Sequence, residues 1–296
     1  MNDSPKRSQI LIALLAVYLI WGSTYFAIKL ALPDYPPFFI TAIRLAIAGL
    51  IMLAYIQYKH YPLPTAKQWK PLVILAAVMT VFASALINVA EQTVSSGVVA
   101  IGVAAMPLWA GFFAALRGYH PSKIEWSGLL LGFFGVVWLN IGSELRVSTI
   151  GLLCVLSAPM AWAWGSMWSK DQDLPDPIVS SAWQMFIGSV IAMAIGLSLG
   201  ERITHLPSTQ STLALLYLTV FGSIVAYSAF VWLVKHVRPA LATSYAYVNP
   251  PIALLLGVTL LDEPLNSHTV VAMILILMSI GIVTLGKRLH QSSTSS

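Results

Sequence analysis

Polar side chains interrupt several apolar stretches that are long enough to cross a membrane. A polar group in lipid is costly unless it is paired, so these residues are the first candidates for contacts with a polar solute. Arg44, about six residues into the stretch 38–58, is a candidate to attract an anion at a cavity mouth. The alternative is an arginine that bonds to another helix or extends its charge to the membrane surface. Gln184 occupies the equivalent place in the second half, which argues against a need for charge in both halves. We include Arg44 and Gln184 among the expected substrate-binding residues.

Asn88 and Glu91 lie near the end of the third apolar stretch, followed by Gln92. Their spacing of three and four residues places them on one face of a helix. If Glu91 is buried, its carboxyl group can take up and release a proton during a transport cycle. The alternative is a solvated loop carboxylate. We include Asn88 and Glu91 among the expected substrate-binding residues.

Tryptophan and tyrosine combine an apolar ring with a polar tip, so they suit amphipathic organic molecules better than bare metal ions. The expected cavity residues of this kind, together with one asparagine, are Trp21, Tyr25, Trp109, Trp162, Trp164, Tyr227, Tyr245, Tyr247 and Asn249. Some of these rings could instead belong to the aromatic belt at the membrane surface.

Pro107, Pro159 and Pro250 each lie inside an apolar stretch. Proline lacks a backbone donor and disfavours helix at the preceding residue, so each is expected to break its helix and act as a hinge. Broken helices near the bilayer midplane are where many transporters place their sites. A simple structural kink is the alternative at each position.

Motifs for catalysis and for cofactors are not found in the sequence. There is no HExxH, no GxSxG, no nucleotide-binding loop and no pair of intramembrane carboxylates. We therefore expect no enzymatic activity, no cofactor and no metal site. Cys154 is the single cysteine, which excludes an intrachain disulfide. The net charge of +5 does not indicate nucleic-acid binding, because the basic residues are scattered through short loops.

The composition indicates an all-α polytopic membrane protein. Hydrophobic residues make up 58% of the chain and charged residues only 9%, which is too little charge to cover a soluble surface. A spanning helix needs about 20 mostly apolar residues. Ten transmembrane helices are predicted, over residues 10–30, 38–58, 71–90, 97–116, 124–141, 149–168, 178–199, 212–234, 240–260 and 267–286.

The distribution of lysine and arginine predicts the orientation of these helices. Lys29 and Arg44 lie within spans, and Arg146 and Arg202 fall in segments on the opposite side from the N-terminus. The other twelve of the 16 basic residues lie on the N-terminal side. Because cytoplasmic loops carry the excess of lysine and arginine, both termini are expected in the cytoplasm.

Similar motifs recur about half a chain length apart. Trp164-Gly165-Ser166 repeats Trp21-Gly22-Ser23, "TVFGS" (219–223) resembles "TVFAS" (80–84), and prolines 37 and 107 match prolines 177 and 250. The chain is therefore expected to contain two five-helix repeats, over residues 10–141 and 149–286. Five is odd, so the second repeat must enter the membrane inverted relative to the first.

Small residues in these motifs are expected at helix contacts. Gly22 and Gly165 allow close approach of another backbone, and Ser23 can bond to its own preceding turn or to a neighbour. Gly128 and Gly132 form a small-xxx-small pattern in the fifth span, which favours helix contact within a monomer or between the protomers of a homodimer.

Four segments carry a family resemblance that covers about residues 10–288. They are "IWGSTYFAIK" (20–29), "VAEQTVSSGVVA" (89–100), "PALATSYAYVNP" (239–250) and "LLDEP" (260–264). With the paired five-helix units, they resemble the EamA-type ten-helix exporters of the drug/metabolite transporter superfamily. His120 departs from the family pattern, which often has a glutamate there, whereas the second half keeps Glu263.

The resemblance implies a protein of the bacterial inner membrane that moves small organic metabolites outward, often amino-acid-like or drug-like compounds. We therefore expect a secondary-active or facilitative exporter that works by alternating access, with the lipid bilayer and a small-molecule substrate as its partners. The alternative on the same scaffold is a translocator of lipids or lipid-linked sugars.

Overall fold

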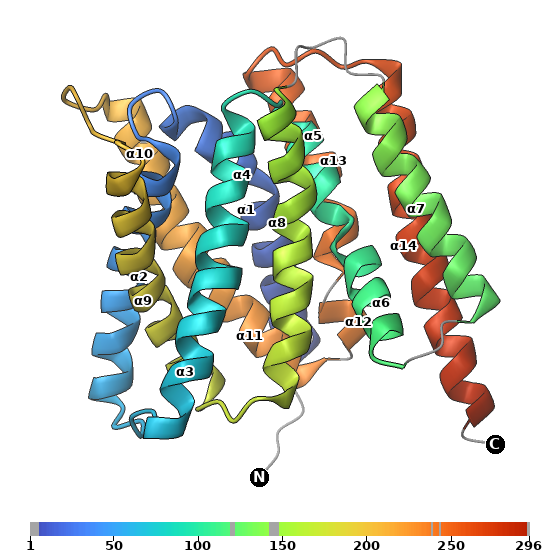
Figure 1. Cartoon of the computed structure of the whole chain (residues 1–296), viewed down its shortest axis with the longest axis horizontal. Coiled ribbons are helices and arrows are strands. Elements are labelled where there is room, and N and C mark those ends of the chain that lie inside the picture. Colours follow the sequence, from blue (N-terminus) through green and yellow to red (C-terminus); the bar gives the residue numbers. More distant parts are fainter. Residues whose placement is uncertain (1–5, 119–121, 142–147, 238, 243, 295–296) are drawn as a thin grey trace.

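The computed structural model describes residues 6–118, 122–141, 148–237, 239–242 and 244–294, and every regular element in these ranges is a helix (Figure 1). In the N-terminal half the helices are α1 (Arg7–Ala31), α2 (Pro37–Tyr58), α3 (Ala66–Leu75), η1 (Ala76–Phe82), α4 (Ala83–Glu91), α5 (Ser96–Ala104), α6 (Met106–Leu116) and α7 (Lys123–Ile141). In the C-terminal half they are α8 (Thr149–Trp168), η2 (Ser169–Asp171), α9 (Pro177–Ser198), α10 (Thr209–Tyr217), η3 (Leu218–Val225), α11 (Ala226–His236), α12 (Pro239–Ala242), α13 (Tyr245–Leu260) and α14 (Ser267–Thr294).

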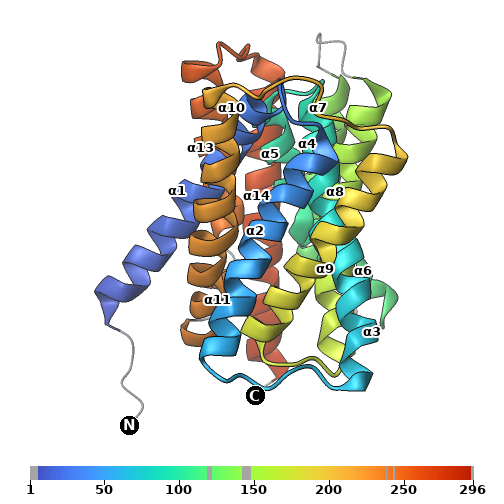
Figure 2. The same cartoon turned by 90° about the vertical axis from the view of Figure 1, so that its left-hand side faces the viewer.

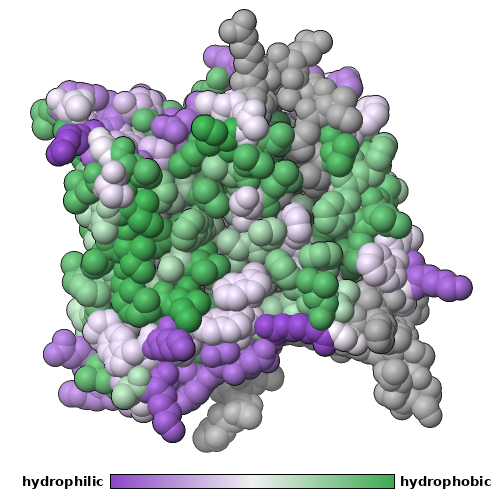
Figure 3. All heavy atoms as spheres, viewed as in Figure 1, coloured by the Kyte–Doolittle hydropathy of each residue, from purple (hydrophilic) through white to green (hydrophobic). Residues whose placement is uncertain are grey.

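Seven helical stretches among the described residues are long and apolar enough to cross a membrane: Arg7–Ala31, Pro37–Tyr58, Ala66–Glu91, Ser96–Leu116, Thr149–Asp171, Pro177–Ser198 and Thr209–Leu233. The other three predicted spans coincide with α7, with α12 and α13, and with α14. Large apolar side chains are exposed on the outside of the bundle, for example Leu19 on α1 and Leu50 on α2. In the space-filling view they form an apolar band between two polar edges, as expected where lipid surrounds the protein (Figure 3).

Prolines at the first helical position and serines at the preceding N-cap position mark where several of these helices begin. Pro37 and Pro177 are the first residues of α2 and α9, where the missing backbone donor has no cost. Ser148 and Ser208 accept hydrogen bonds from the amides of the third residue of α8 and of α10, at 2.9 and 3.2 Å. The prolines that precede the second and seventh predicted spans therefore mark true helix starts.

The prolines expected as hinges differ in their effect. The helix of the fourth span is interrupted at Ala105, and Pro107 lies in the first turn of α6, as expected. The expected breaks at Pro159 and Pro250 are wrong, because α8 and α13 run through these residues without interruption. In the ninth span the helix is instead interrupted between α12 and α13, several residues before Pro250.

Two π-helical segments replace regular α-helix in the third and eighth spans. The η1 segment lies between α3 and α4, and η3 lies between α10 and α11. Both contain the repeated Thr-Val-Phe, at Thr80–Phe82 and Thr219–Phe221. A π turn widens the helix and shifts its later residues around the axis, and such turns are frequent at functional sites.

Helices from the two halves pack against each other in matching pairs. The pairs α2 with α9 and α7 with α14 lie side by side (Figures 1 and 2). Likewise α1 packs on α10, η3 and α11, while α8 packs on η1 and α4. Gly49 allows the α2–α9 contact, because a Cβ atom there would lie 2.8 Å from the backbone nitrogen of Phe186.

The glycines of the fifth span also serve contacts within the chain. A Cβ atom on Gly128 would lie 3.0 Å from the carbonyl oxygen of Ser279 in α14, and one on Gly132 would lie 2.6 Å from the Ser279 hydroxyl. The small-xxx-small pattern is thus used within the chain, between α7 and α14.

The loops gather at two edges of the bundle. At one edge Gln68 donates to Asp173 at 3.0 Å, and Arg117 pairs with Asp171 at 2.8 Å. The start of α1 and the end of α14 lie at this same edge (Figures 1 and 2). We call it the terminal edge. Arg146 and His120 lie outside the described residues, as does Arg238, one of the twelve basic residues expected on the N-terminal side.

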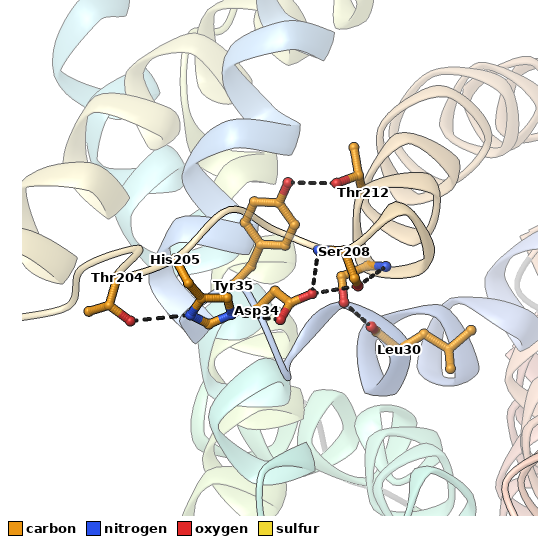
Figure 4. Close-up of polar contacts among 8 residues, drawn as sticks. Leu30, Asp34, Tyr35, Thr204, His205, Ser208 and Thr212 are labelled. Carbon is orange, nitrogen blue, oxygen red and sulfur yellow. Dashed lines mark hydrogen bonds and ion pairs between the residues drawn. The ribbon is translucent and has the colours of Figure 1, made fainter.

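At the opposite edge a cluster of Asp34, His205 and Ser208 joins the α1–α2 loop to the α9–α10 loop (Figure 4). Asp34 accepts hydrogen bonds from the backbone amide of Ser208 and from the His205 ring, each at 2.8 Å. Hydrogen bonds from the Ser208 side chain, and then from His205, hold the pKa of Asp34 well below its ordinary value. The cluster connects the first half of the chain to the second.

Replacing Gly49 with alanine is expected to destabilise the protein. The new Cβ atom would clash with the backbone of α9, and overpacking of this kind costs about 1–3 kcal/mol. Gly281→Ala in α14 is the matched control, because no atom lies within 4 Å of its Cβ position. Thermal unfolding of the purified protein in detergent measures both variants. Equal melting temperatures for Gly49→Ala and Gly281→Ala would contradict the α2–α9 contact.

Asp34→Asn is expected to lower the melting temperature at neutral pH. A carboxyl group with a lower pKa in the folded than in the unfolded state stabilises the fold while it is ionised. That contribution is present above the ordinary aspartate pKa of about 3.9 and is lost as the pH falls below it. The difference between wild type and Asp34→Asn should therefore shrink in acid. His205→Gln should keep this acid dependence, because Ser208 still donates, and a constant difference at all pH values would contradict the account.

Candidate functional site

A cavity of about 340 Å³ lies at the centre of the bundle, which is within the usual range for small-molecule sites. Its wall is built from both halves of the chain, by α1, α2, η1, α4, α5, α6, α8, α9, η3, α11 and α13. Ten of the residues selected from the sequence line it: Trp21, Tyr25, Arg44, Pro159, Trp162, Gln184, Tyr227, Tyr245, Asn249 and Pro250. Their role in substrate binding stays a prediction.

The two π-helical segments face this cavity. Met79 and Thr80 of η1 and Gly222 and Ser223 of η3 all contribute to the wall. The widened turn in η3 is closed by Ser223, whose hydroxyl donates to the carbonyl of Leu218, five residues earlier, at 3.2 Å. Irregular backbone at membrane depth is tolerated where it lines a cavity, which accounts for the place of both segments.

Arg44 is held by η3. Its Nε donates to the Ser223 hydroxyl at 3.0 Å, across the contact between the two halves. Part of the Arg44 side chain stays accessible, although protein surrounds it, because it faces the cavity. Arg44 thus bonds to another helix, as the alternative interpretation expected, and it also lines the cavity, where its role as an anion-attracting group stays a prediction.

An aromatic wall forms around Trp21. Its ring centroid lies 5.2 Å from that of Phe230 and 4.9 Å from that of Tyr245, the second in edge-on geometry. Its indole nitrogen donates to the Gly222 carbonyl in η3 at 3.1 Å. The repeated tryptophan of the first span thus connects α1 to a carbonyl group of the π-helical segment.

The polar groups of the wall are mostly fixed by neighbours. The Tyr227 and Ser181 hydroxyls lie 2.7 Å apart, and Gln184 donates to the Ser180 hydroxyl at 2.7 Å. Asn249, in the amide orientation that satisfies its nitrogen, donates to the carbonyl of Tyr18 at 3.2 Å. This bond ties α13 to α1, and Asn249 also lines the cavity, where it was expected from the sequence.

Asn88 and Glu91 are fully buried but do not line the cavity. Asn88 donates to the Pro37 carbonyl and to the Thr41 hydroxyl, each at 2.9 Å, and so holds α4 against α2. Neither carboxyl oxygen of Glu91 has a hydrogen-bond partner among the described residues. Glu91 is thus not the solvated loop carboxylate of the alternative interpretation. Lys29 lies nearby, and its ammonium group donates to the Glu91 and Val94 carbonyls.

The remaining selected residues lie away from the cavity. Trp109 packs edge-on against Phe133 at 5.5 Å, and Trp164 is an exposed ring stacked on Trp168. Tyr247 packs on the apolar cluster between α5 and α14, and Pro107 begins α6 outside the cavity lining.

Several cavity residues were not selected from the sequence. They are small or flexible side chains and one aromatic ring: Thr24, Met79, Thr80, Ser84, Ser166, Ser181, Met185, Ser223 and Phe230. The repeat contained a signal for some of them, because Ser84 and Ser223 end the two matching TVFAS and TVFGS motifs. Arg44 is the one charged side chain in the described lining, and the described residues contain no cluster of metal-ligating side chains.

The repeated Trp-Gly-Ser motifs serve close packing, although not against the backbone that was expected. A Cβ atom on Gly22 would lie 2.9 Å from the Ile252 side chain, and one on Gly165 would lie 2.3 Å from the Met79 side chain. Ser23 donates to the Leu19 carbonyl at 2.7 Å, in its own preceding turn. The neighbours of both glycines are thus side chains of other helices rather than backbone.

Helical stretches of membrane-spanning length around a central, partly polar cavity indicate a polytopic membrane protein. The sequence profile of the EamA-like transporter family matches residues 8–141 and 149–285. The chain belongs to this family, as the sequence motifs predicted.

Comparison with known proteins gives relatives along nearly the whole chain. The chain is 37% identical to the protein named "Uncharacterized inner membrane transporter YedA" of Escherichia coli K12, over 94% of this chain and 91% of the relative. It is 28% identical to the Arabidopsis thaliana protein named "WAT1-related protein At3g02690, chloroplastic", over 91% of this chain and 68% of the relative. A solved crystal structure with 20% identity superimposes with a TM-score of 0.66, covering 95% of this chain and 99% of the other, which supports the fold.

Proposed function

We propose that the protein is a secondary-active or facilitative exporter of small organic metabolites across the bacterial inner membrane. The observation that carries the proposal is the central cavity, which both halves of the chain build and both π-helical segments line. Its size suits a small organic molecule, and its mixture of aromatic rings and hydroxyl groups suits an amphipathic one. Membership of a transporter family supports the same activity.

Ten transmembrane helices in two inverted five-helix repeats, residues 10–141 and 149–286, are part of this proposal. Equivalent polar contacts in the two halves support it. In the first half Asn88 bonds to Thr41, whose hydroxyl donates to the carbonyl four residues earlier. In the second half Tyr227 bonds to Ser181, whose hydroxyl likewise donates to the carbonyl four residues earlier. In Figure 1, α1 leaves the terminal edge whereas α8 runs toward it, as an inverted repeat requires.

Alternating access follows from such symmetry. If each half can adopt either of two shapes, an exchange of shapes opens the cavity first to one side and then to the other. The contacts at the two edges, Arg117–Asp171 and Asp34–His205, are of the kind that such an exchange would break in turn. We further propose that the terminal edge faces the cytoplasm, because the segments there carry most of the basic residues.

Reconstituted protein is expected to release preloaded solutes from liposomes. A panel of radiolabelled amino acids and amphipathic dyes, with protein-free liposomes as background, measures the rate. Ser84→Phe places a ring in the cavity and should reduce efflux to near background. The matched control is Ser127→Phe on the exposed face of α7, which should keep the wild-type rate.

Two results would contradict the exporter. One is background rates for the wild type across the whole panel. The other is translocation of a fluorescent phospholipid that Ser84→Phe blocks, with no efflux of soluble compounds, which would establish the lipid translocator instead.

A further inference from the structure

The charge of Arg44 is not balanced within the cavity. Arg44 is the one charged side chain in the described lining, and the lining contains no aspartate or glutamate. The ion pairs found among the described residues are Arg117–Asp171 and His205–Asp34, both at the edges of the bundle. Glu91 is buried elsewhere, where it interacts with Lys29 and Glu263. The described lining of the cavity thus carries one positive charge without a negative partner.

The guanidinium group of Arg44 is held in place by one hydrogen bond, and most of its donors make no hydrogen bond to the described residues. It stays protonated in proteins and has five N–H donors in a rigid fork. The contact with Ser223 uses Nε, and no hydrogen bond from its terminal nitrogens is found among the described residues. A guanidinium fork of this kind matches a carboxylate, which accepts two parallel hydrogen bonds.

Leaving such a charge without a partner at membrane depth is costly. A glutamine occupies the equivalent position in the second half, so the scaffold does not require an arginine there. Gln184 also lines the cavity, where it donates to Ser180. The cost is offset if a solute brings the missing negative charge.

The rest of the wall suits an apolar body. The rings of Trp21, Phe230 and Tyr245 pack against one another on one part of the wall, and Trp162 and Met185 line other parts. An amphipathic molecule would therefore place its charged end at Arg44 and its apolar body against the rings.

We propose that the substrates are amphipathic organic anions with one carboxylate, which binds Arg44 while the apolar body contacts the aromatic wall. This inference rests on the proposed function, because it specifies the substrate class of the same cavity. Neutral and cationic compounds of the same shape bind more weakly, since they leave the guanidinium group without a counter-charge.

Binding of matched compounds to the full-length protein tests the proposal. The probes are 3-phenylpropionate, 3-phenylpropionamide and 3-phenylpropylamine. Octanoate, octanamide and octylamine form a second series, in which the apolar part is an alkyl chain. Calorimetry in detergent should show the acids binding at least about tenfold more tightly than the amides and amines, as expected for a charged hydrogen bond. Arg44→Gln should remove this preference, and Arg44→Lys should keep part of it.

The control variant is Arg202→Gln, which removes an exposed positive charge from the α9–α10 loop and should bind as wild type does. The readout is the ratio of the affinities for the acid and for the amide. A variant that simply binds every probe more weakly leaves this ratio unchanged, so it does not imitate the loss of acid preference expected for Arg44→Gln. Equal affinity for acids and amides in the wild type, or no binding of any probe, would overturn the proposal. An acid preference that survives Arg44→Gln would also overturn it.

Efflux assays separate this inference from the proposed function. Transport of the amides and amines but not of the acids would leave the exporter in place and reject the anion site. Tight, Arg44-dependent binding of acids without transport of any compound would support the anion site and reject the exporter.

Discussion

The need to satisfy backbone hydrogen bonds inside lipid determines where this protein can be irregular. Water is absent from the membrane interior, so each peptide group must find a partner in its own helix or in a neighbouring side chain. The two π-helical segments at this depth, η1 and η3, both line the central cavity. Side chains compensate for the altered turns, because Trp21 donates to the Gly222 carbonyl and Ser223 donates to the Leu218 carbonyl. Trp21 and Ser223 therefore both line the cavity and supply hydrogen bonds to the carbonyl groups of its irregular backbone.

The same constraint links the cavity to the contacts between the two halves. Helices in lipid associate through close packing of small residues rather than through the hydrophobic effect. Gly49 brings α9 against α2, and this contact carries Arg44 and Gln184 on adjoining helices into one wall. Ser223, from the other half, then orients Arg44. The cavity exists only when both halves are assembled, as alternating access by exchange of two similar units requires.

The sequence predicted the positions of the helices well, but it predicted less well which face of each helix points toward the cavity. Apolar stretches bounded by Pro37, Pro177 and loop residues predicted the positions of helices. The charge of Arg44 inside such a stretch and the polar tip of Trp21 selected two residues that line the cavity. By contrast, Trp109 and Trp162 each lie in an apolar stretch close to a proline, so the sequence does not distinguish them. Trp109 packs among phenylalanines, whereas Trp162 lines the cavity. Lipid and protein interior are both apolar, so an apolar pattern does not indicate which face of a helix points inward. The π turns and the continuous helix through Pro159 also depend on tertiary neighbours, which local propensity does not contain.

The central claim is that the cavity opens to each side of the membrane in turn, and cysteine accessibility tests it most directly. With Cys154 replaced by alanine, Ser84→Cys provides a single thiol in the cavity wall. Lys67→Cys at the terminal edge and Arg202→Cys at the opposite edge serve as controls for sidedness. A membrane-impermeant thiol reagent should label each control from one side only, from opposite sides, and should label Ser84→Cys from both. Labelling of Ser84→Cys from only one side, or from neither, would contradict the account.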